Sequence, residues 1–464
     1  MDLDLIVDNG ILVIPKTGLF RGCLGIQQGK IVGLYDSPAG LTFREKIDAG
    51  GRYILPGLVE PHVHYGYRGN LKDHLQTETA SAALGGITTV IPFYRDIENP
   101  TGLYENIPSI KKLAEAQAYI DFSLHLLLIT RRQLLNVKKY FYEFGIPSFK
   151  FYMAYKGEDA KSIGLVGNET DDGFLFEAFS KLAGIPGALA CVHAENIEIV
   201  LPLIKQFKEQ NKNGLSVWSE CRPNFSEWES VHRAVTFAGV AGCPLYVAHL
   251  STHESIKEVR ILKTKYKNIF SETCPHYLTL TKDAPLGNLA KVNPPLRDSE
   301  DIEALWQGIV DGAIDTMGSD HCPFRREDKQ GQIWDAKTGF PGSATLLPVL
   351  LNEGVHKRGL SLEKVAEITS YNPARIFHLF PQKGTLQIGS DADLCILDLS
   401  LKKTVHHQDL KSYSDFSLYE GLTLQGWPVM TLVRGQVVMK DGQITISPGH
   451  GRFIESQFTS SSSV

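Results

Sequence analysis

Cysteine is sparse in this sequence, and its few copies are too far apart to form a structural framework. The chain has 464 residues and 7 cysteines, and no two of these form a Cys-x-x-Cys pair. An odd number of scattered cysteines argues against a disulfide framework and against a structural zinc knuckle. We therefore expect buried, reduced thiols in a cytoplasmic protein.

Long apolar runs and clusters of positive charge are also lacking. The apolar stretches, such as 124–129, have the length of a strand and fall far short of a membrane span. The first residues are acidic and lack the basic region of a signal peptide. The net charge of -5 does not suit a protein that binds nucleic acid. We expect no membrane partner and no nucleic acid, but small molecules or further copies of the chain.

Both ends of the sequence have the pattern of short β-strands separated by turns. Asp-Asn-Gly, Lys-Thr-Gly and Gln-Gln-Gly turns separate the N-terminal runs at 5–7, 10–14, 24–27 and 30–34. The C-terminal runs are 392–397, 427–433 and 436–439. We expect residues 1–55 and 382–455 to pair into one small β-sandwich domain, followed by a flexible Ser-rich tail at 456–464.

The middle of the chain, residues 56–381, alternates apolar strands with amphipathic helices. The expected strands include 88–92, 122–129, 188–193, 244–249 and 314–319. The expected helices include 106–118, 195–210, 228–241 and 252–265. Alternation of this kind implies parallel strands with helical crossovers. Repeated about eight times, it predicts a (β/α)8 barrel of the TIM type in the α/β class.

Two histidines end the first expected barrel strand. His62 and His64 follow the apolar run 54–59 and are two residues apart. Residues i and i+2 of a strand face the same way, so both imidazoles point to one side. Active sites of such barrels lie at the carboxyl ends of the strands. One such pair is a weak signal, because surface strands carry it by chance.

The same kind of side chain ends three later strands. His193 ends the strand at 188–193, His249 ends that at 244–249, and Asp320 follows that at 314–319. Thr252 stands in an N-cap position after His249. Any one of these residues alone is more simply a core histidine or a capping aspartate. Their recurrence at four strand ends favours a metal site.

The number of candidate ligands suggests two metal ions. His62, His64, His193, His249 and Asp320 are too many for one tetrahedral ion with an open position. Lys150 lies in an apolar, strand-like segment, where a free ammonium would be costly and would repel cations. Reaction with CO2 would convert it into an anionic carbamate that can bridge two ions. The simpler interpretation, a lysine that reaches out from a strand end to solvent, stays open on residue types alone.

From about residue 3 to 445 the chain resembles the amidohydrolase superfamily, and within it the dihydropyrimidinase/hydantoinase branch. The segment SFKFYMAYKG at 148–157 is the one specific to hydantoinase-like enzymes. The other matching segments are LPGLVEPHVH (55–64), GGITT (85–89), VHAEN (192–196), ETCPHYL (272–278), GSDHCPF (318–324), NPAR (372–375) and GSDAD (389–393).

The resemblance implies a role for each candidate residue. Lys150 is implied to be a carboxylated lysine that bridges two divalent ions, with zinc expected. The four histidines are implied to be metal ligands. Asp320 is implied to be both a ligand and the catalytic base, and Tyr155 to donate its hydroxyl to the carbonyl oxygen of the scissile amide. The expected reaction is metal-dependent opening of cyclic amides, such as hydantoins and dihydropyrimidines, to N-carbamoyl amino acids. A homotetramer or dimer is also expected from the resemblance.

The sequence departs from that branch where the substrate would bind. Asn293 stands before Pro-Pro-Leu-Arg, as in dihydroorotases, and Gly339 lies in a segment that lacks the usual asparagine before Pro-Gly. Both segments are expected to hold the ring. Dihydroorotases place an arginine two residues after His-x-His, where this chain has Gly66. The residues considered for the ring substituent are Tyr65, Tyr67, Tyr94 and Tyr152, with Arg68 or Arg95 for an acidic one.

Two other functions remain open at this point. Asn293 and the Ser-Thr-His-Glu-Ser segment at 251–255 fit a dihydroorotase or an allantoinase. Relatives of this fold that lost their metal ligands act as assembly proteins, so a non-catalytic scaffold is a third candidate. Retention of the complete set of six candidate ligands argues against the scaffold.

Overall fold

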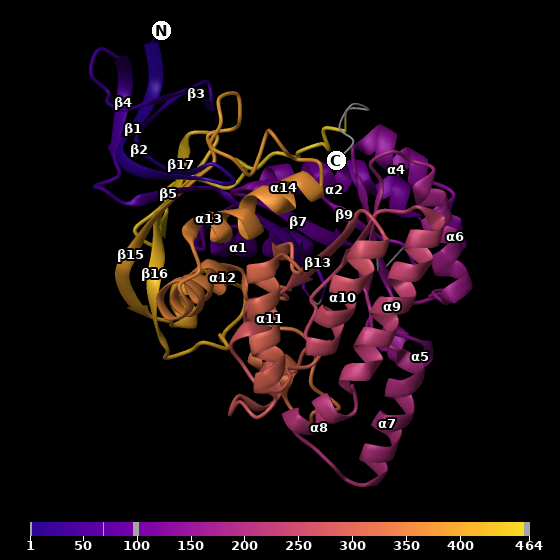
Figure 1. The fold of residues 1–464 in the computed structure, drawn as a ribbon. Helices are drawn as coiled ribbons and strands as arrows, with labels where there is room; N and C mark the ends of the chain where they lie inside the picture. Colours follow the sequence, from indigo (N-terminus) through magenta and orange to yellow (C-terminus); the bar gives the residue numbers. More distant parts are fainter. Residues whose placement is uncertain (1, 68, 96–101, 459–464) are drawn as a thin grey trace.

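The computed structural model describes residues 2–67, 69–95 and 102–458. Figure 1 shows two parts, a helix-wrapped barrel and a sheet built from both chain ends. Eight parallel strands form the barrel in the order β14-β13-β12-β11-β10-β9-β7-β6, and β8 pairs with β7. A parallel bridge between Val63 and His321 brings the two edges of the barrel together. The (β/α)8 prediction is confirmed.

The barrel strands are short. They are β6 (Leu58–Val63), β7 (Ile87–Tyr94), β8 (Asp121–Phe122), β9 (His125–Leu127), β10 (Ser148–Tyr152), β11 (Leu189–His193), β12 (Leu245–Val247), β13 (Ile269–Thr273) and β14 (Thr316–Met317). The strand predicted at 122–129 is divided into β8 and β9. Both pieces pair with β7 at the same offset, Val90 with Phe122 and Phe93 with His125, so the strand is interrupted without a change of register.

Helices cover the outside of the barrel (Figure 1). They are α1 (Leu71–Leu84), α2 (Leu103–Gln117), α3 (Arg131–Leu134), α4 (Val137–Phe144), α5 (Gly157–Ser162), α6 (Asp172–Ala183), α7 (Ile197–Glu209), α8 (Leu215–Glu220), α9 (Asn224–Ala241), α10 (His253–Lys265), α11 (Ser299–Asp311), α12 (Ser343–Leu350), α13 (Leu362–Ala366) and α14 (Asn372–Ile376). Thr252 is the N-cap of α10 and accepts a hydrogen bond from the backbone N–H of Ser255, as predicted. Among the described residues, no helix is long and apolar enough to cross a membrane.

Alternation along β10 shows how the sequence places polar groups inside the barrel. Phe149 and Phe151 pack outward in the main core, where Phe151 contacts Phe174 and Phe179 of α6. Because side chains alternate along a strand, Lys150 and Tyr152 face the barrel interior. The floor beneath them is apolar and is formed by Val59, Ile91, Phe93, Leu189, Cys191, Tyr246, Ala248, Ala374, Ile376, Phe377, Leu379 and Ile454.

The second sheet joins the two chain ends. Its order is β18-β17-β16-β15-β5-β1-β2-β3, with β4 beside β1, and the antiparallel pair β5–β15 connects the two halves. The strands are β1 (Asp2–Ile14), β2 (Gly18–Gln27), β3 (Lys30–Tyr35), β4 (Thr42–Asp48), β5 (Tyr53–Pro56), β15 (Leu394–Thr404), β16 (Thr423–Val433), β17 (Gln436–Lys440) and β18 (Gln443–Ile444).

Two local predictions need correction. The Asp-Asn-Gly sequence at 8–10 does not separate two strands, because Asn9 adopts a positive φ of 55° and makes a bulge within β1. The C-terminal stretch, predicted to complete the β domain and then become a tail, returns to the barrel. Ile454 donates a backbone hydrogen bond to Phe122, and Phe458 packs on Phe141, because these apolar side chains find cover there. Residues 459–464 of the predicted tail lie outside the described residues.

Candidate active site

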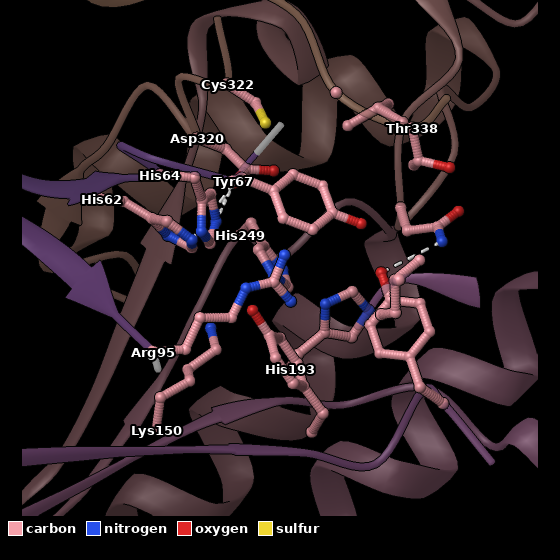
Figure 2. Close-up of a pocket in the computed structure, with 16 residues that line it drawn as sticks. His62, His64, Tyr67, Arg95, Lys150, His193, His249, Asp320, Cys322 and Thr338 are labelled. Atoms are coloured by element: carbon pink, nitrogen blue, oxygen red, sulfur yellow. Dashed lines mark hydrogen bonds and ion pairs between the residues drawn. The ribbon is translucent and has the colours of Figure 1, made fainter. Parts of the chain in front are cut away.

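His62 and His64 lie at the carboxyl end of β6 and meet Asp320 from beyond β14. The Nε2 atoms of His62 and His64 lie 3.2 and 3.0 Å from Asp320 Oδ1. Burial lowers the pKa of His64 to about 4, so this imidazole is neutral and has a lone pair to offer. Burial alone would raise the pKa of Asp320, but the two histidines hold it below its usual range. Figure 2 shows the three side chains converging on one side of the cavity.

Buried carboxylates behind His62 fix its orientation. Glu272 at the end of β13 lies 2.6 Å from His62 Nδ1 and also accepts from the hydroxyl of Tyr246 and the backbone N–H of His249. Glu60 accepts from the backbone N–H groups of His62 and Ser319. A carboxylate on one ring nitrogen leaves the other free to bind a metal, the arrangement typical of metal-binding histidines.

His193 is held in a similar way at the end of β11. Its Nε2 lies 2.6 Å from Glu195, which is also paired with Arg222 at 3.0 Å. Burial would raise the pKa of Glu195, but Arg222 and His193 hold it at about 2, so the carboxylate is charged. The other ring nitrogen of His193, Nδ1, is therefore available to bind a metal ion, and the residue lines the cavity.

His249 and Asp320 share an unusual backbone conformation. Their φ angles are +40° and +50°, in the left-handed region that costs a non-glycine residue free energy. Strained residues of this kind gather at functional sites. The His249 ring lies 4.4 Å from the His193 ring and 5.2 Å from the His62 ring, measured between centroids, and its buried Nδ1 has no hydrogen-bond partner in the described part of the chain.

Lys150 is fully buried, and its Nζ forms no hydrogen bond in the described part of the chain. The amine lies 4.5 Å from the centre of the Phe93 ring. Burial lowers the pKa of this amine, and the neighbouring acids only partly oppose that effect. A lowered pKa favours the neutral form of an amine, which is the form that reacts as a nucleophile.

One cavity collects most of the residues predicted from the sequence. Tyr152, Tyr155, Asn293 and Gly339 line it together with the six candidate ligands. Asn293 Nδ2 donates to the Tyr155 hydroxyl at 3.3 Å, and its Oδ1 accepts from Trp218 at 3.1 Å. Burial raises the pKa of Tyr155 well above its usual value, so the hydroxyl keeps its proton. The remaining lining residues are Tyr67, Arg95, Ile163, Val292, Cys322 and Thr338.

Tyr65 and Tyr94 do not line this cavity. Tyr65 packs in the core beside His321, with ring centroids 6.0 Å apart. The cause is the alternation that points His62 and His64 inward, since Val63 and Tyr65 must then face the helices. Tyr94 is half-buried against the same core. Arg68 lies outside the described residues.

Sequence reasoning assigned no role to the acids that hold the histidines. Glu195 had a signal, because it lies two residues after His193 at the end of β11, whereas Glu272 lies near the end of β13, a strand without a candidate ligand. Arg222 gave no signal, since it precedes α9 and reaches Glu195 only through the fold.

The fold and these side chains define a barrel with a candidate metal centre at its carboxyl end. The model of the "Amidohydrolase family" matches residues 53–438, and the chain belongs to that family. It is 34% identical to the L-hydantoinase of Paenarthrobacter aurescens over 97% of this chain and 98% of the relative. It is 33% identical to the D-hydantoinase of Geobacillus stearothermophilus over 97% and 96%.

Solved structures agree with these relatives. The L-hydantoinase (dihydropyrimidinase) from Arthrobacter aurescens superposes with a TM-score of 0.89 at 33% identity, over 98% of this chain and 100% of that one. The dihydropyrimidinase from Brevibacillus agri NCHU1002 superposes with a TM-score of 0.90 at 30% identity, over 97% and 98%. This chain is therefore similar in sequence and fold to enzymes named for both L- and D-hydantoin substrates.

Proposed function

We propose that the protein hydrolyses a ring C–N bond of cyclic amides of the hydantoin and dihydropyrimidine type and releases N-carbamoyl amino acids. The observation that carries this proposal is the convergence of six side chains on one cavity at the carboxyl end of the barrel. They are His62, His64, Lys150, His193, His249 and Asp320. The names of the relatives indicate the substrate class.

The side chains fit a pair of divalent metal ions, and zinc suits ligands of this kind. His249 Nδ1 and Lys150 Nζ are buried without a hydrogen-bond partner among the described residues, which is costly unless something else satisfies them. His62, His64 and Asp320 have ligand atoms within 4.8 Å of one another. Bound ions would polarise the scissile carbonyl and lower the pKa of an attacking water.

Lys150 fits the bridging role after carboxylation. Its neutral Nζ would attack CO2, form an N–C bond and release one proton, which leaves an anionic carbamate with two oxygens. Carboxylation would turn the buried amine into an anion, which suits a site where four imidazoles would hold metal cations. A ¹³C resonance of a carbamate after exchange with labelled bicarbonate, lost in Lys150→Ala, tests the carboxylation directly.

The remaining steps belong to protein groups. Asp320 would accept the proton of the attacking water and pass it to the leaving ring nitrogen. The Tyr155 hydroxyl, protonated and oriented by Asn293, would donate a hydrogen bond to the carbonyl oxygen as negative charge develops there. Asn293 and the backbone at Gly339 lie on the cavity wall, where they would hold the ring.

The complete ligand set argues against a non-catalytic scaffold, because such a protein would not need a strained Asp320 or a buried Lys150 without a hydrogen-bond partner among the described residues. By resemblance we also propose a homotetramer or dimer that acts in the cytoplasm. Light scattering on the purified protein tests the assembly.

Ring opening tests the proposed activity. The zinc-supplemented protein is given dihydrouracil, hydantoin, 5-phenylhydantoin, allantoin and dihydroorotate, and loss of the cyclic amide is followed by ultraviolet absorbance. We expect turnover of the hydantoins or dihydrouracil, and a loss of about 10²- to 10⁴-fold in kcat for Asp320→Asn, with the metal largely retained by the other five ligands. Turnover of allantoin or dihydroorotate alone would assign the alternative activities. Silence on all five, with two ions per chain bound, would refute the substrate class.

A further inference from the structure

Arg95 places a cation in the cavity that the proposed reaction does not use. The residue follows β7, and its side chain lines the cavity. Its guanidinium carbon lies 3.8 Å from the centre of the Tyr67 ring, which lines the same cavity. Figure 2 shows the Arg95 side chain directed into the space enclosed by the candidate ligands.

This guanidinium has no counter-ion in the described part of the chain. No aspartate or glutamate there forms an ion pair with Arg95. Its guanidinium instead lies over the Tyr67 ring. The carboxylate on the cavity wall belongs to Asp320, which is engaged by His62 and His64. By contrast, the buried Arg222 behind His193 is paired with Glu195 at 3.0 Å.

The neighbours of Arg95 cannot supply the missing negative charge. Tyr152 and Cys322 line the same cavity and lie close enough to interact electrostatically with the guanidinium. Neither is a carboxylate: a phenol and a thiol ordinarily ionise at about pH 10 and 8.5, so neither is a ready counter-ion at neutral pH. A half-buried cation that no described carboxylate pairs with gains most from an anion that arrives with the ligand.

The geometry narrows the kind of anion. A ring stacked on the guanidinium fixes its plane and leaves its edge N–H groups free to donate. A planar carboxylate accepts two such parallel hydrogen bonds. The candidate ligands and Tyr155 already act on the ring amide that breaks, so the carboxylate must belong to a substituent of the ring.

We propose that Arg95 binds a carboxylate on the ring substituent, so that the cavity selects cyclic amides with an acidic side group. This inference rests on the proposed function and names the substrate class of the same site. Arg95 is then a specificity residue, and it acts on substrate binding.

A pair of matched substrates tests this. Racemic hydantoin-5-acetic acid and its primary amide have nearly the same shape and differ in one charge. We expect the zinc-loaded enzyme to prefer the acid by about 10- to 100-fold in kcat/KM, the range of a charged hydrogen-bonded pair. Arg95→Gln should abolish the preference by raising the KM for the acid much more than the KM for the amide or for hydantoin. Added salt should weaken binding of the acid alone.

Lys156→Gln is the matched control, because it removes a cation next to Tyr155 that is paired with Glu198 and does not line the cavity. It should keep the preference. A wild-type enzyme that treats both substrates alike, or an Arg95→Gln variant that loses activity on both equally, would overturn the inference.

Calorimetric binding of both compounds tests the inference separately from the proposed function. If no ring opens, the proposed activity fails, and tighter binding of the acid that depends on Arg95 still supports the inference, whereas equal binding refutes it.

Discussion

A buried amine needs a counter-ion or must lose its charge, and Lys150 Nζ has no hydrogen-bond partner among the described residues. Lys150→Ala should therefore remove the bridge between the proposed ions. We expect metal content to fall below two ions per chain and kcat/KM to fall by more than about 100-fold, since even outer partners of metal ligands are worth 10- to 100-fold. Elemental analysis and ring-opening rates measure both. Lys181→Ala, at a half-buried position on α6 where the lysine pairs with Glu177, is the control.

Addition of a short carboxylic acid to Lys150→Ala supplies a replacement for the missing anion. Partial recovery of turnover would support the bridging role. Normal metal content together with a normal rate in that variant would contradict it.

Glu272 is the second residue on which the metal site depends. Its carboxylate contacts His62 Nδ1 at 2.6 Å and also holds the backbone of His249. Glu272→Gln keeps the shape but removes the charge, so metal affinity should fall by about 10- to 100-fold. Competition with a chelator of known affinity measures this change. The exposed Glu209→Gln on α7 should bind metal as the wild type does, and equal affinity in both variants would show that Glu272 does not support the site.

For single residues, the sequence was most informative about side chains near the carboxyl ends of strands. His62, His64, His193, His249, Asp320 and Lys150 do surround one cavity, because the carboxyl ends of parallel strands meet there. Arg222 could not be found, since its contact with Glu195 spans elements whose packing the sequence does not state. Tyr65 was misplaced because the inward direction of His62 and His64 forces it outward.

The segment at 336–339 contributes to the cavity wall without being part of a strand, and buried lysines hold its backbone in place. Lys329 Nζ donates to the carbonyl oxygens of Lys337 and Gly339, and the backbone N–H of Gly339 donates to the backbone carbonyl oxygen of Lys291. Gly339 has a φ of +119°, and a Cβ there would lie 2.8 Å from Cys322 Cβ. The wall thus needs glycine at this position.

Gly339→Ala should lower the free energy of unfolding by about 1–3 kcal/mol through strain and should lower kcat/KM because the wall must move. Urea unfolding and ring-opening kinetics measure the two effects. Gly359→Ala is the matched control, because Gly359 has a φ of +71° with no atom within 4 Å of the added Cβ. It should lose stability and keep activity. Equal activity in the two variants would argue against a role for the wall.

Element types were predictable, and local backbone detail was not. Periodicity placed α9 and α10 close to their observed bounds because long amphipathic stretches carry a strong signal. The Asp-Asn-Gly sequence was ambiguous, since asparagine in the left-handed region serves a turn or a bulge equally well. In the structure β1 continues through this sequence with a bulge, pairing with β4 before it and with β5 after it.

For the whole molecule, a buried charge cluster connects the barrel to the sheet of the chain ends. Lys383 has a fully buried side chain and pairs with Asp121 at 2.5 Å, Asp393 at 2.7 Å and Asp391 at 3.0 Å. Asp121 belongs to β8 of the barrel, and Asp393 immediately precedes β15 of the sheet. Such contacts between distant segments cannot be read from local patterns. The β-strand pattern of both ends predicted only that the two ends pair into one small β-sandwich domain.

Lys383→Met should lower the free energy of unfolding by about 3–5 kcal/mol, because it leaves buried carboxylates without their shared cation. Urea unfolding followed by circular dichroism measures this. Lys440→Met, at an exposed position in β17, should be close to neutral. A Lys383→Met protein as stable as that control would show that the cluster does not hold the two parts together.

In the proposed function, the residues at the carboxyl end of the barrel act through bound metal ions. The most direct test of this role is hydantoin ring opening by the same sample before chelation, after removal of metal to below one ion per chain, and after addition of zinc. The proposal predicts that turnover disappears with the metal and returns with it in proportion to the ions bound per chain. Turnover that persists in the metal-free protein would contradict it.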